Sequence, residues 1–457
     1  MLKKIIPFCL TIAFVLNISA QEKTTNAIEG DWKGTLDAMG AKLRLVFHIS
    51  KADDVYKVSM DSPDQGVKDF PLQQISYAND TLKIAHPAMM MTYTGILKAD
   101  KIEGDYAQGG MTFPMNLERG TVELKRPQTP KKPYPYNEEE VSILNHKDQV
   151  ILAGTYTTPR DKKDFPVAIL ISGSGPQDRD ETLFEHRPFL VLADHLTKNG
   201  IAVLRYDDRG IAQSTGDFAK ATSYDFANDV KAIISFLKVT KDIPSNKIYL
   251  VGHSEGGMIA PIVNASEKNL GGLVLMAAPG VAIEQLFVKQ QYDLYSKSGM
   301  PISAVDSITK NNKGFYEILN SVEKSEIELA FRTYGKSIKM SDIEIEEQLQ
   351  VANDAWFYNF ITFNPQAYLQ KVNVPVLAIN GGKDLQVDAD MNLAGIENAL
   401  KISGNKAYEI KKYDNLNHLF QEAETGLPQE YGKIEETLSP EVLHKIANWI
   451  NERHSKK

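Results

Sequence analysis

The chain has 457 residues, of which 42% are hydrophobic and 24% are charged, and its formal net charge is −8. This length and hydrophobic content are sufficient for a sizeable core and predict two or three domains. The acidic balance, with no basic stripe, argues against nucleic acid as a partner.

The first 20 residues have the pattern of a cleavable signal peptide. Lys3 and Lys4 precede an apolar stretch at 5–15, and the small-residue sequence Ile18-Ser19-Ala20 precedes Gln21. The apolar stretch is too short to span a bilayer, which needs about 20 residues. We therefore expect a secreted or periplasmic protein with no membrane association after cleavage of the signal.

The single cysteine, Cys9, lies inside this predicted signal. The mature chain would then contain no cysteine. Disulfides, thiol catalysis and cysteine-ligated metals are excluded on this basis.

Residues 21–126 are predicted to form an N-terminal β domain. Short alternating segments at 42–49, 55–60 and 81–84 are separated by turn residues. This pattern is typical of an antiparallel meander that curls into a small barrel or sandwich. The segment Gly30-Asp31-Trp32-Lys33-Gly34 resembles the first strand of lipocalin-like barrels. Such a domain could bind a glycan, a lipid or a partner.

A proline-rich linker is predicted at 127–140, where four prolines fall within nine residues. From 141 to 457 the pattern changes to alternating strands and helices. Five apolar runs are typical of buried parallel strands, namely 167–172, 201–206, 248–252, 273–277 and 376–380. Helical patterns lie between them, which predicts a doubly wound, mostly parallel sheet. The region of about 281–368 has no such run, and we expect it to be an inserted helical cap.

The sequence Gly252-His253-Ser254-Glu255-Gly256 lies between an apolar run and a helical pattern. This is the strand–turn–helix context of a G-x-S-x-G nucleophile elbow. Glycines allow a turn tight enough to expose the hydroxyl of Ser254. The alternative interpretation is a glycine-rich turn that merely packs.

A serine nucleophile needs a base that is oriented by a carboxylate, and with this elbow they follow in the order Ser, Asp or Glu, His. Asp384 follows the predicted strand at 376–380, and His418 follows a strand-like segment at 407–411. The carboxyl ends of parallel strands converge on one crevice, so Ser254, Asp384 and His418 can meet there. Asp388 and Asp390 are rivals to Asp384, and each of the three could instead be a surface carboxylate.

Two backbone N–H groups are candidates for the oxyanion hole, those of Glu255 and Ser174. Ser174 lies in the glycine-containing loop that follows the strand at 167–172, a loop that could also be an ordinary polar turn. The aromatic run with Trp356, Phe357 and Phe360 either lines a substrate pocket or forms the core of the cap.

Three motifs carry a family resemblance: the segment at 173–180, the segment Arg205-Tyr206-Asp207-Asp208-Arg209-Gly210 with Ser214-Thr215-Gly216, and the segment at 252–257. Together they resemble an α/β-hydrolase, and more narrowly the bacterial carboxylesterases grouped with the serine-aminopeptidase-like hydrolases. The resemblance implies hydrolysis of carboxylic esters through an acyl-Ser254 intermediate, with no metal and no cofactor. Typical members have a histidine before the oxyanion-loop glycine, where this chain has Ser172.

The main hypothesis is therefore a secreted serine carboxylesterase that acts on small-molecule esters. A serine peptidase that releases N-terminal residues is the nearest alternative, and it would need an acidic pocket for the substrate ammonium group. A non-catalytic binding protein, with the β domain as its active part, is the alternative from another class.

Overall fold

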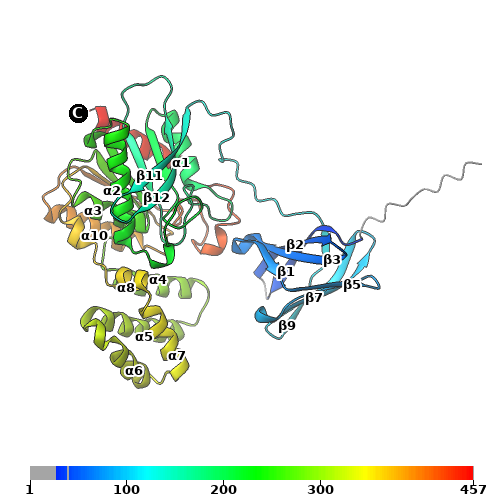
Figure 1. Ribbon diagram of the computed structural model, residues 1–457. Helices are drawn as coiled ribbons and strands as arrows, with labels where there is room; N and C mark the ends of the chain where they lie inside the picture. The colour runs from blue at the N-terminus through cyan, green and yellow to red at the C-terminus, as the bar shows by residue number, and fades with distance from the viewer. Residues whose placement is uncertain (1–26, 39–40, 456–457) are drawn as a thin grey trace, which may run out of the picture. The chain divides into compact units, whose positions relative to one another are not determined.

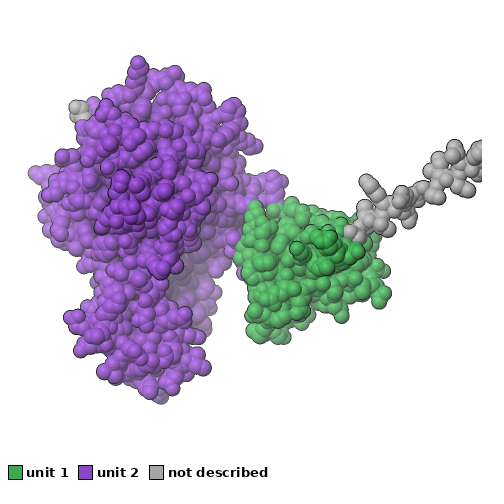
Figure 2. Space-filling view, viewed as in Figure 1, with its two compact units in different colours: residues 1–62, 67–122 green, residues 63–66, 123–457 purple. Residues whose placement is uncertain are grey.

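The computed structural model describes residues 27–38 and 41–455 (Figure 1). The predicted signal peptide, with Cys9, lies outside the described residues. The chain forms two compact units (Figure 2). Among the described residues, the β unit contains 27–38, 41–62 and 67–122, and the α/β unit contains 63–66 and 123–455.

The β unit is an antiparallel sheet that curls toward a barrel. Its strands follow the order β4-β3-β2-β1-β10-β8-β7-β6-β5, and β9 pairs with β8. The strands are β1 (Gly30–Ala38), β2 (Ala41–Ala52), β3 (Val55–Ser62), β4 (Val67–Leu72), β5 (Gln74–Ala78), β6 (Thr81–His86), β7 (Met91–Lys98), β8 (Lys101–Gln108), β9 (Met111–Pro114) and β10 (Leu117–Arg119). Because β1 pairs with β10, the first and last strands lie together, and the ends of the hydrogen-bonded path are β4 and β5.

Tight hairpins set the register of these strands. Asp53 and Asp54 join β2 to β3 with φ values of 50° and 61°, and Asn79 and Asp80 join β5 to β6 with 50° and 57°. A two-residue turn with positive φ at both positions matches the twist of the flanking strands, and Asn and Asp tolerate this conformation. Trp32 fills the centre of the core, and its indole N–H donates to the Ile28 carbonyl at 2.8 Å.

The α/β unit is built on an eight-stranded sheet in the order β11-β12-β14-β13-β15-β16-β17-β18. These strands are β11 (Asn137–Asn145), β12 (Val150–Thr158), β13 (Val167–Ile171), β14 (Ala202–Tyr206), β15 (Ile248–His253), β16 (Gly272–Met276), β17 (Val376–Gly381) and β18 (Tyr408–Tyr413). The first two pair in antiparallel fashion, and β13 to β18 are parallel. β11 begins inside the range predicted as linker, because its four polar N-terminal residues pair with β12 and expose their side chains.

Helices cover both faces of this sheet. α1 (Pro188–Lys198) and α11 (Pro440–Ser455) pack on one face. α2 (Ser223–Thr240), α3 (Glu255–Asn264) and α10 (Ala389–Ile402) pack on the other. Alternate residues of the central strands contribute to the two cores, which explains the uninterrupted apolar runs in the sequence.

The cap is inserted between β16 and β17 (Figure 1). It consists of α4 (Ile283–Lys297), α5 (Ile302–Ser321), α6 (Ile327–Ser337), α7 (Asp342–Ala352), α8 (Ala355–Ile361) and α9 (Gln366–Leu369). A β unit followed by a doubly wound sheet with a helical insertion confirms the predicted fold class. None of the helices in the described residues is both long enough and apolar enough to cross a bilayer.

Candidate active site

The predicted nucleophile lies on a strained turn. β15 ends at His253 and α3 begins at Glu255, so Ser254 is the single residue between them, with φ 52° and ψ −117°. A non-glycine residue at such a φ is strained, and its persistence requires support from its surroundings. The Ser254 N–H donates to the Met276 carbonyl at 2.8 Å, which ties the turn to the end of β16.

The flanking glycines are required by close backbone contacts. A side chain at Gly252 would collide with the carbonyl of Gly256, and one at Gly256 would collide with the carbonyl of Ile171 in β13. A methyl group at Gly257 would collide with the side chain of Ala278. The elbow therefore packs directly against β13 and against the segment that follows β16, as its glycine pattern predicts.

Asp384 and His418 lie together at the carboxyl ends of β17 and β18. The His418 Nδ1 is 2.8 Å from Asp384 Oδ2, and both residues are buried. The other carboxylate oxygen of Asp384 accepts from the backbone N–H groups of Gln386 and Val387, each at 2.8 Å. These two bonds fix the plane of the carboxylate, and the carboxylate in turn fixes the imidazole.

The rival carboxylates have other partners. Asp388 caps α10 by accepting from the Met391 N–H at 2.8 Å, and it lies 3.2 Å from Lys289. Asp390 is exposed and pairs with Lys412 at 2.8 Å. Of the three acids, Asp384 alone is bonded to His418 in the described structure.

The loop after β13 lies against the nucleophile. A methyl group at Gly173 would stand 3.2 Å from the Cβ of Ser254, so the loop backbone passes directly beside the elbow. The Gly173 N–H donates to Glu181 Oε1 at 2.8 Å and is not available to a substrate. Ser174 is exposed, and within the described residues its N–H donates to no other group. Its role in an oxyanion hole remains a prediction.

Buried acids hold this loop in place. Ser172 Oγ donates to Asp208 Oδ1 at 2.9 Å, and the Gln177 N–H donates to the other oxygen of Asp208 at 3.1 Å. Burial raises the pKa of Asp208 well above its usual value, against the opposing effect of these two bonds. Asp207 pairs with Arg179 at 2.7 Å. Asp207 and Asp208 therefore brace the loop, by these hydrogen bonds and this ion pair.

The Glu255 side chain joins the elbow to the cap. It is buried, and its carboxyl accepts from Ser223 Oγ at 2.5 Å and from the Trp356 indole N–H at 3.1 Å. Burial raises the pKa of Glu255 to about 7. Sequence reasoning identified the backbone of this residue and missed its side chain, whose partners lie far away in the chain.

The aromatic residues of α8 pack on one another and on α4. Trp356 stacks on Phe360 with ring centroids 4.9 Å apart, while Phe287 contacts Phe357 and Phe360 edge-on at 6.2 and 5.9 Å. Phe360 is buried, and Trp356 and Phe357 are half-buried. The structure thus brings Trp356 to the elbow. The lining of a substrate pocket by these rings remains a prediction.

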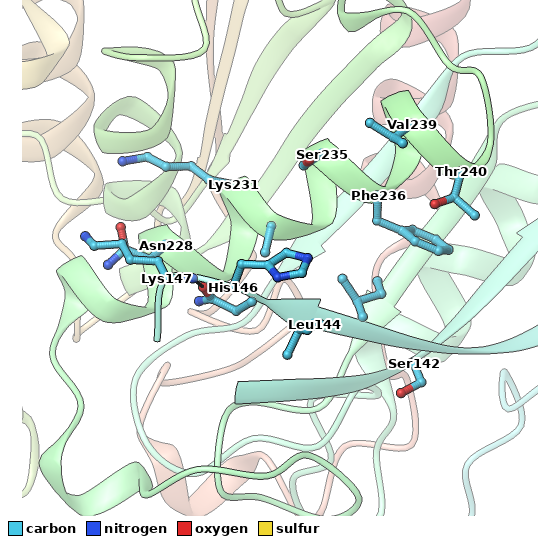
Figure 3. A pocket seen from close by; sticks show the side chains of 13 residues that line it. Ser142, Leu144, His146, Lys147, Asn228, Lys231, Ser235, Phe236, Val239 and Thr240 are labelled. Carbon is cyan, nitrogen blue, oxygen red and sulfur yellow. Dashed lines mark hydrogen bonds between the residues drawn. The ribbon is translucent and has the colours of Figure 1, made fainter. Parts of the chain in front are cut away.

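A separate groove lies between β11 and α2, with a volume of about 450 Å³ (Figure 3). Its apolar lining residues include Leu144, Phe236 and Val239, and Lys147 and Lys231 lie toward one end (Figure 3). Three strands separate β11 from β15 in the sheet. This groove is therefore distinct from the predicted active site.

Among the described residues, His48, Asp61 and Asp69 of the β unit bring possible metal-ligand atoms within 4.8 Å of one another. His48 is already bonded to Asp31 at 2.8 Å and lies 3.0 Å from Asp61. Interactions between these side chains account for the cluster without an ion.

Comparison with known proteins gives consistent matches. Residues 186–306 match the family model described as serine aminopeptidase, S33. Esterase EstD of Thermotoga maritima is 27% identical over 319 residues, which cover 70% of this chain and 68% of that protein.

Among solved structures, the esterase Pf2001 of Pyrococcus furiosus is 18% identical with a TM-score of 0.40, covering 69% of this chain and 93% of its own. A proline iminopeptidase of Mycobacterium smegmatis is 14% identical with a TM-score of 0.43, covering 70% and 99%.

Proposed function

We propose that this chain, an α/β-hydrolase related to the bacterial carboxylesterases and the serine-aminopeptidase-like hydrolases, cleaves carboxylic esters through an acyl intermediate on Ser254. The relationship itself was predicted from the motifs, and the family match and the esterase relative confirm it. The reaction, the substrate class and the residue roles are the proposal.

The observation that carries the proposal is the bonded pair Asp384–His418 at the same edge of the sheet as the strained Ser254. With Nδ1 donating to Asp384, the Nε2 atom of His418 has the lone pair that a general base requires. It takes the Ser254 proton as Oγ attacks the ester carbonyl. The Glu255 and Ser174 N–H groups hold the oxyanion of the tetrahedral intermediate.

To complete acylation, His418 acts as a general acid. His418 gives its proton to the leaving alcohol oxygen, and the acyl group stays on Ser254. In the second half of the reaction, water loses a proton to His418 and attacks the acyl carbon. As the tetrahedral intermediate collapses, His418 returns that proton to Ser254 Oγ, and the carboxylic acid leaves. No cofactor is needed for these steps.

Ester substrates are favoured over peptides by the location of the acidic side chains in the cap. A peptidase that releases N-terminal residues needs an acidic pocket for the substrate ammonium group. The glutamates at 323–328 and 344–347 are exposed on the cap, and two of them, Glu328 and Glu346, pair with Arg332. If the protein cleaved aminoacyl amides faster than short acyl esters, the peptidase alternative would replace the proposed esterase.

The proposal places the enzyme outside the cytoplasm, secreted or in the periplasm, after cleavage before Gln21. Sequencing the N-terminus of the protein recovered from its native host tests this point. A start at Met1 would contradict it. The β unit is proposed as an accessory module that could bind a glycan, a lipid or a partner.

The decisive experiment uses an active-site-directed fluorophosphonate on the chain from Gln21, with intact-mass detection. We expect a single adduct that is lost in Ser254→Ala, together with a fall in ester turnover of about 10⁴-fold or more. Ser266→Ala, at an exposed serine just after α3, is the control that should keep both the adduct and the ester turnover. Turnover retained in Ser254→Ala would contradict the proposal.

A further inference from the structure

His253, the residue before the nucleophile, is buried with both ring nitrogens in hydrogen bonds. Its Nε2 lies 3.0 Å from the carbonyl oxygen of His418, and its Nδ1 lies 2.9 Å from Glu181 Oε1. A carbonyl can only accept, so Nε2 must carry a hydrogen. The Glu181 oxygen accepts a second bond from the Gly173 N–H, as expected of a carboxylate.

These acceptors assign a charged imidazolium to His253 and a carboxylate to Glu181. Burial by itself would lower the pKa of His253, but the charge and hydrogen bond of Glu181, with the His418 carbonyl, raise it above its usual value. Both residues are only 6% exposed. Burying two charges is costly unless they are paired and hydrogen-bonded, and this pair has further bonds to the Gly173 N–H and to the His418 carbonyl.

The pair joins the parts of the site that come from different segments. Glu181 holds the N–H of Gly173, the residue before the predicted oxyanion donor Ser174. His253 holds the backbone of His418, and the two imidazole rings lie 4.8 Å apart. The elbow, the loop after β13 and the loop after β18 therefore meet at one buried ion pair.

The backbone of Glu181 is strained, which indicates that its surroundings hold this residue in place. Its φ is 53°, in the left-handed region that side chains other than glycine rarely adopt. Strain of this kind persists only where the surrounding contacts over-determine it. The bonds to Gly173 and His253 supply such contacts.

We propose that Glu181 and His253 are positioning residues for the hydrolysis proposed above. They hold the oxyanion loop and the base His418 in register with Ser254. His253 transfers no proton itself, since both of its N–H groups are already bonded. The proposal rests on the proposed function for its reaction, while the charge state of the pair is independent of the substrate.

A positioning role predicts a loss of kcat with little change in KM. A misplacement of about 1 Å in a catalytic group can cost about 100-fold in rate. We expect Glu181→Gln and His253→Gln each to lower kcat by about 10- to 100-fold. Because the two residues act as one unit, the double variant should lose no more than the worse single variant.

The experiment measures kcat and KM on a short acyl ester, and the rate of fluorophosphonate labelling, for the full chain from Gln21. Nitrogen-15 NMR of the His253 ring gives a separate reading. The wild type should show both nitrogens protonated at pH 7 to 8, and Glu181→Gln should show a neutral ring. Thermal unfolding of each variant separates misfolding from misplacement.

His186→Gln is the matched control. This histidine is also fully buried, and it is bonded to Thr437 Oγ at 2.8 Å and to the Tyr431 carbonyl at 3.0 Å. Its loss should lower the unfolding temperature while folded protein keeps kcat and the labelling rate within about threefold. The contrast separates the positioning of the site from the general cost of removing a buried histidine.

The outcomes distinguish this inference from the proposed function. Wild-type kcat in the Glu181 and His253 variants, losses that simply add in the double variant, or a neutral His253 ring in the wild type would each overturn the positioning role. A wild type that labels but does not cleave esters would overturn the ester substrate only. The labelling rates and the NMR would then still test the pair.

Discussion

The loops at the carboxyl edge of the sheet bury their ionisable side chains, whereas the acidic residues of the cap helices α6 and α7 lie on the surface. Asp384, His418, Glu181 and His253 are all buried, and each has a hydrogen-bonded partner. The acidic residues of α6 and α7 are exposed, and the interior of the cap is aromatic, with Phe315 packed on Phe331 at 4.7 Å.

This difference indicates separate roles for the two regions. Buried polar groups that are hydrogen-bonded to one another hold their positions in a low dielectric and favour preorganised electrostatic catalysis. An aromatic region with a polar outer surface favours binding of apolar groups. Changes in the loops should therefore act mainly on kcat, and changes in the cap mainly on KM. Glu255 belongs to both regions, since its backbone lies in the elbow and its side chain reaches α8.

Among the variants that test this difference between the loops and the cap, Asp384→Asn should cause the largest loss of kcat. An amide in place of the carboxylate would favour the wrong tautomer of His418, because its NH₂ group cannot accept from Nδ1–H. We expect kcat to fall by about 10³- to 10⁴-fold with little change in KM, measured on a short acyl ester.

Asp390→Asn is the control for this prediction, since Asp390 is exposed and pairs only with Lys412 among its described contacts. It should keep kcat within about twofold. A collapse of activity in Asp390→Asn, with Asp384→Asn near the wild type, would reassign the acid.

The strands of the sheet and the chain order of the three candidate catalytic residues could be predicted from the sequence, because both depend on local patterns. Apolar runs predicted the parallel strands to within one or two residues, from β13 to β17. Glycines on both sides of Ser254 predicted the elbow, and the chain order led from there to Asp384 and His418. Their roles remain predictions, although the structure brings these last two together.

The contacts that sequence reasoning missed are those that only the folded chain creates. His253 meets Glu181 across 72 positions, and Trp356 meets Glu255 across 101. A glutamate and a histidine look like ordinary polar residues until burial removes water and leaves each with specific partners. The one available signal was the pair of polar residues on either side of Ser254, in a turn that must be buried to function.

The second prediction concerns the pH dependence of stability. Burial raises the pKa of Glu255 from 4.5 to about 7, so the folded chain keeps a proton that the unfolded chain releases. Stability should therefore fall as pH rises from 4.5 to 7 and then stay level, by up to about 1.4 kcal/mol per pH unit for this one group. Glu255→Gln cannot ionise, so its stability should fall less over the same range.

Urea unfolding at pH 5, 6, 7 and 8 measures this difference. Glu347→Gln, on the exposed side of α7, should follow the wild-type curve and serves as the cap control. Parallel curves for Glu255→Gln and the wild type would show that Glu255 is ionised in the folded chain throughout. The elbow would then carry a negative charge beside the predicted oxyanion donor, and the division between the two regions would need revision.

The smallest expected effect is that of Trp356→Phe, which tests the connection between the regions. The variant keeps an aromatic ring to stack on Phe360 and loses only the indole N–H that bonds Glu255. One hydrogen bond contributes about 1 kcal/mol, so we expect a three- to tenfold rise in KM with kcat within about threefold.

Trp449→Phe is the matched control, because the buried Trp449 indole N–H has no hydrogen-bond partner in the described structure. It removes the same group from α11 and should leave KM unchanged. A fall in kcat without a change in KM would mean that Trp356 acts through Glu255 on the elbow, and the cap would then share in the chemistry that the loops otherwise carry.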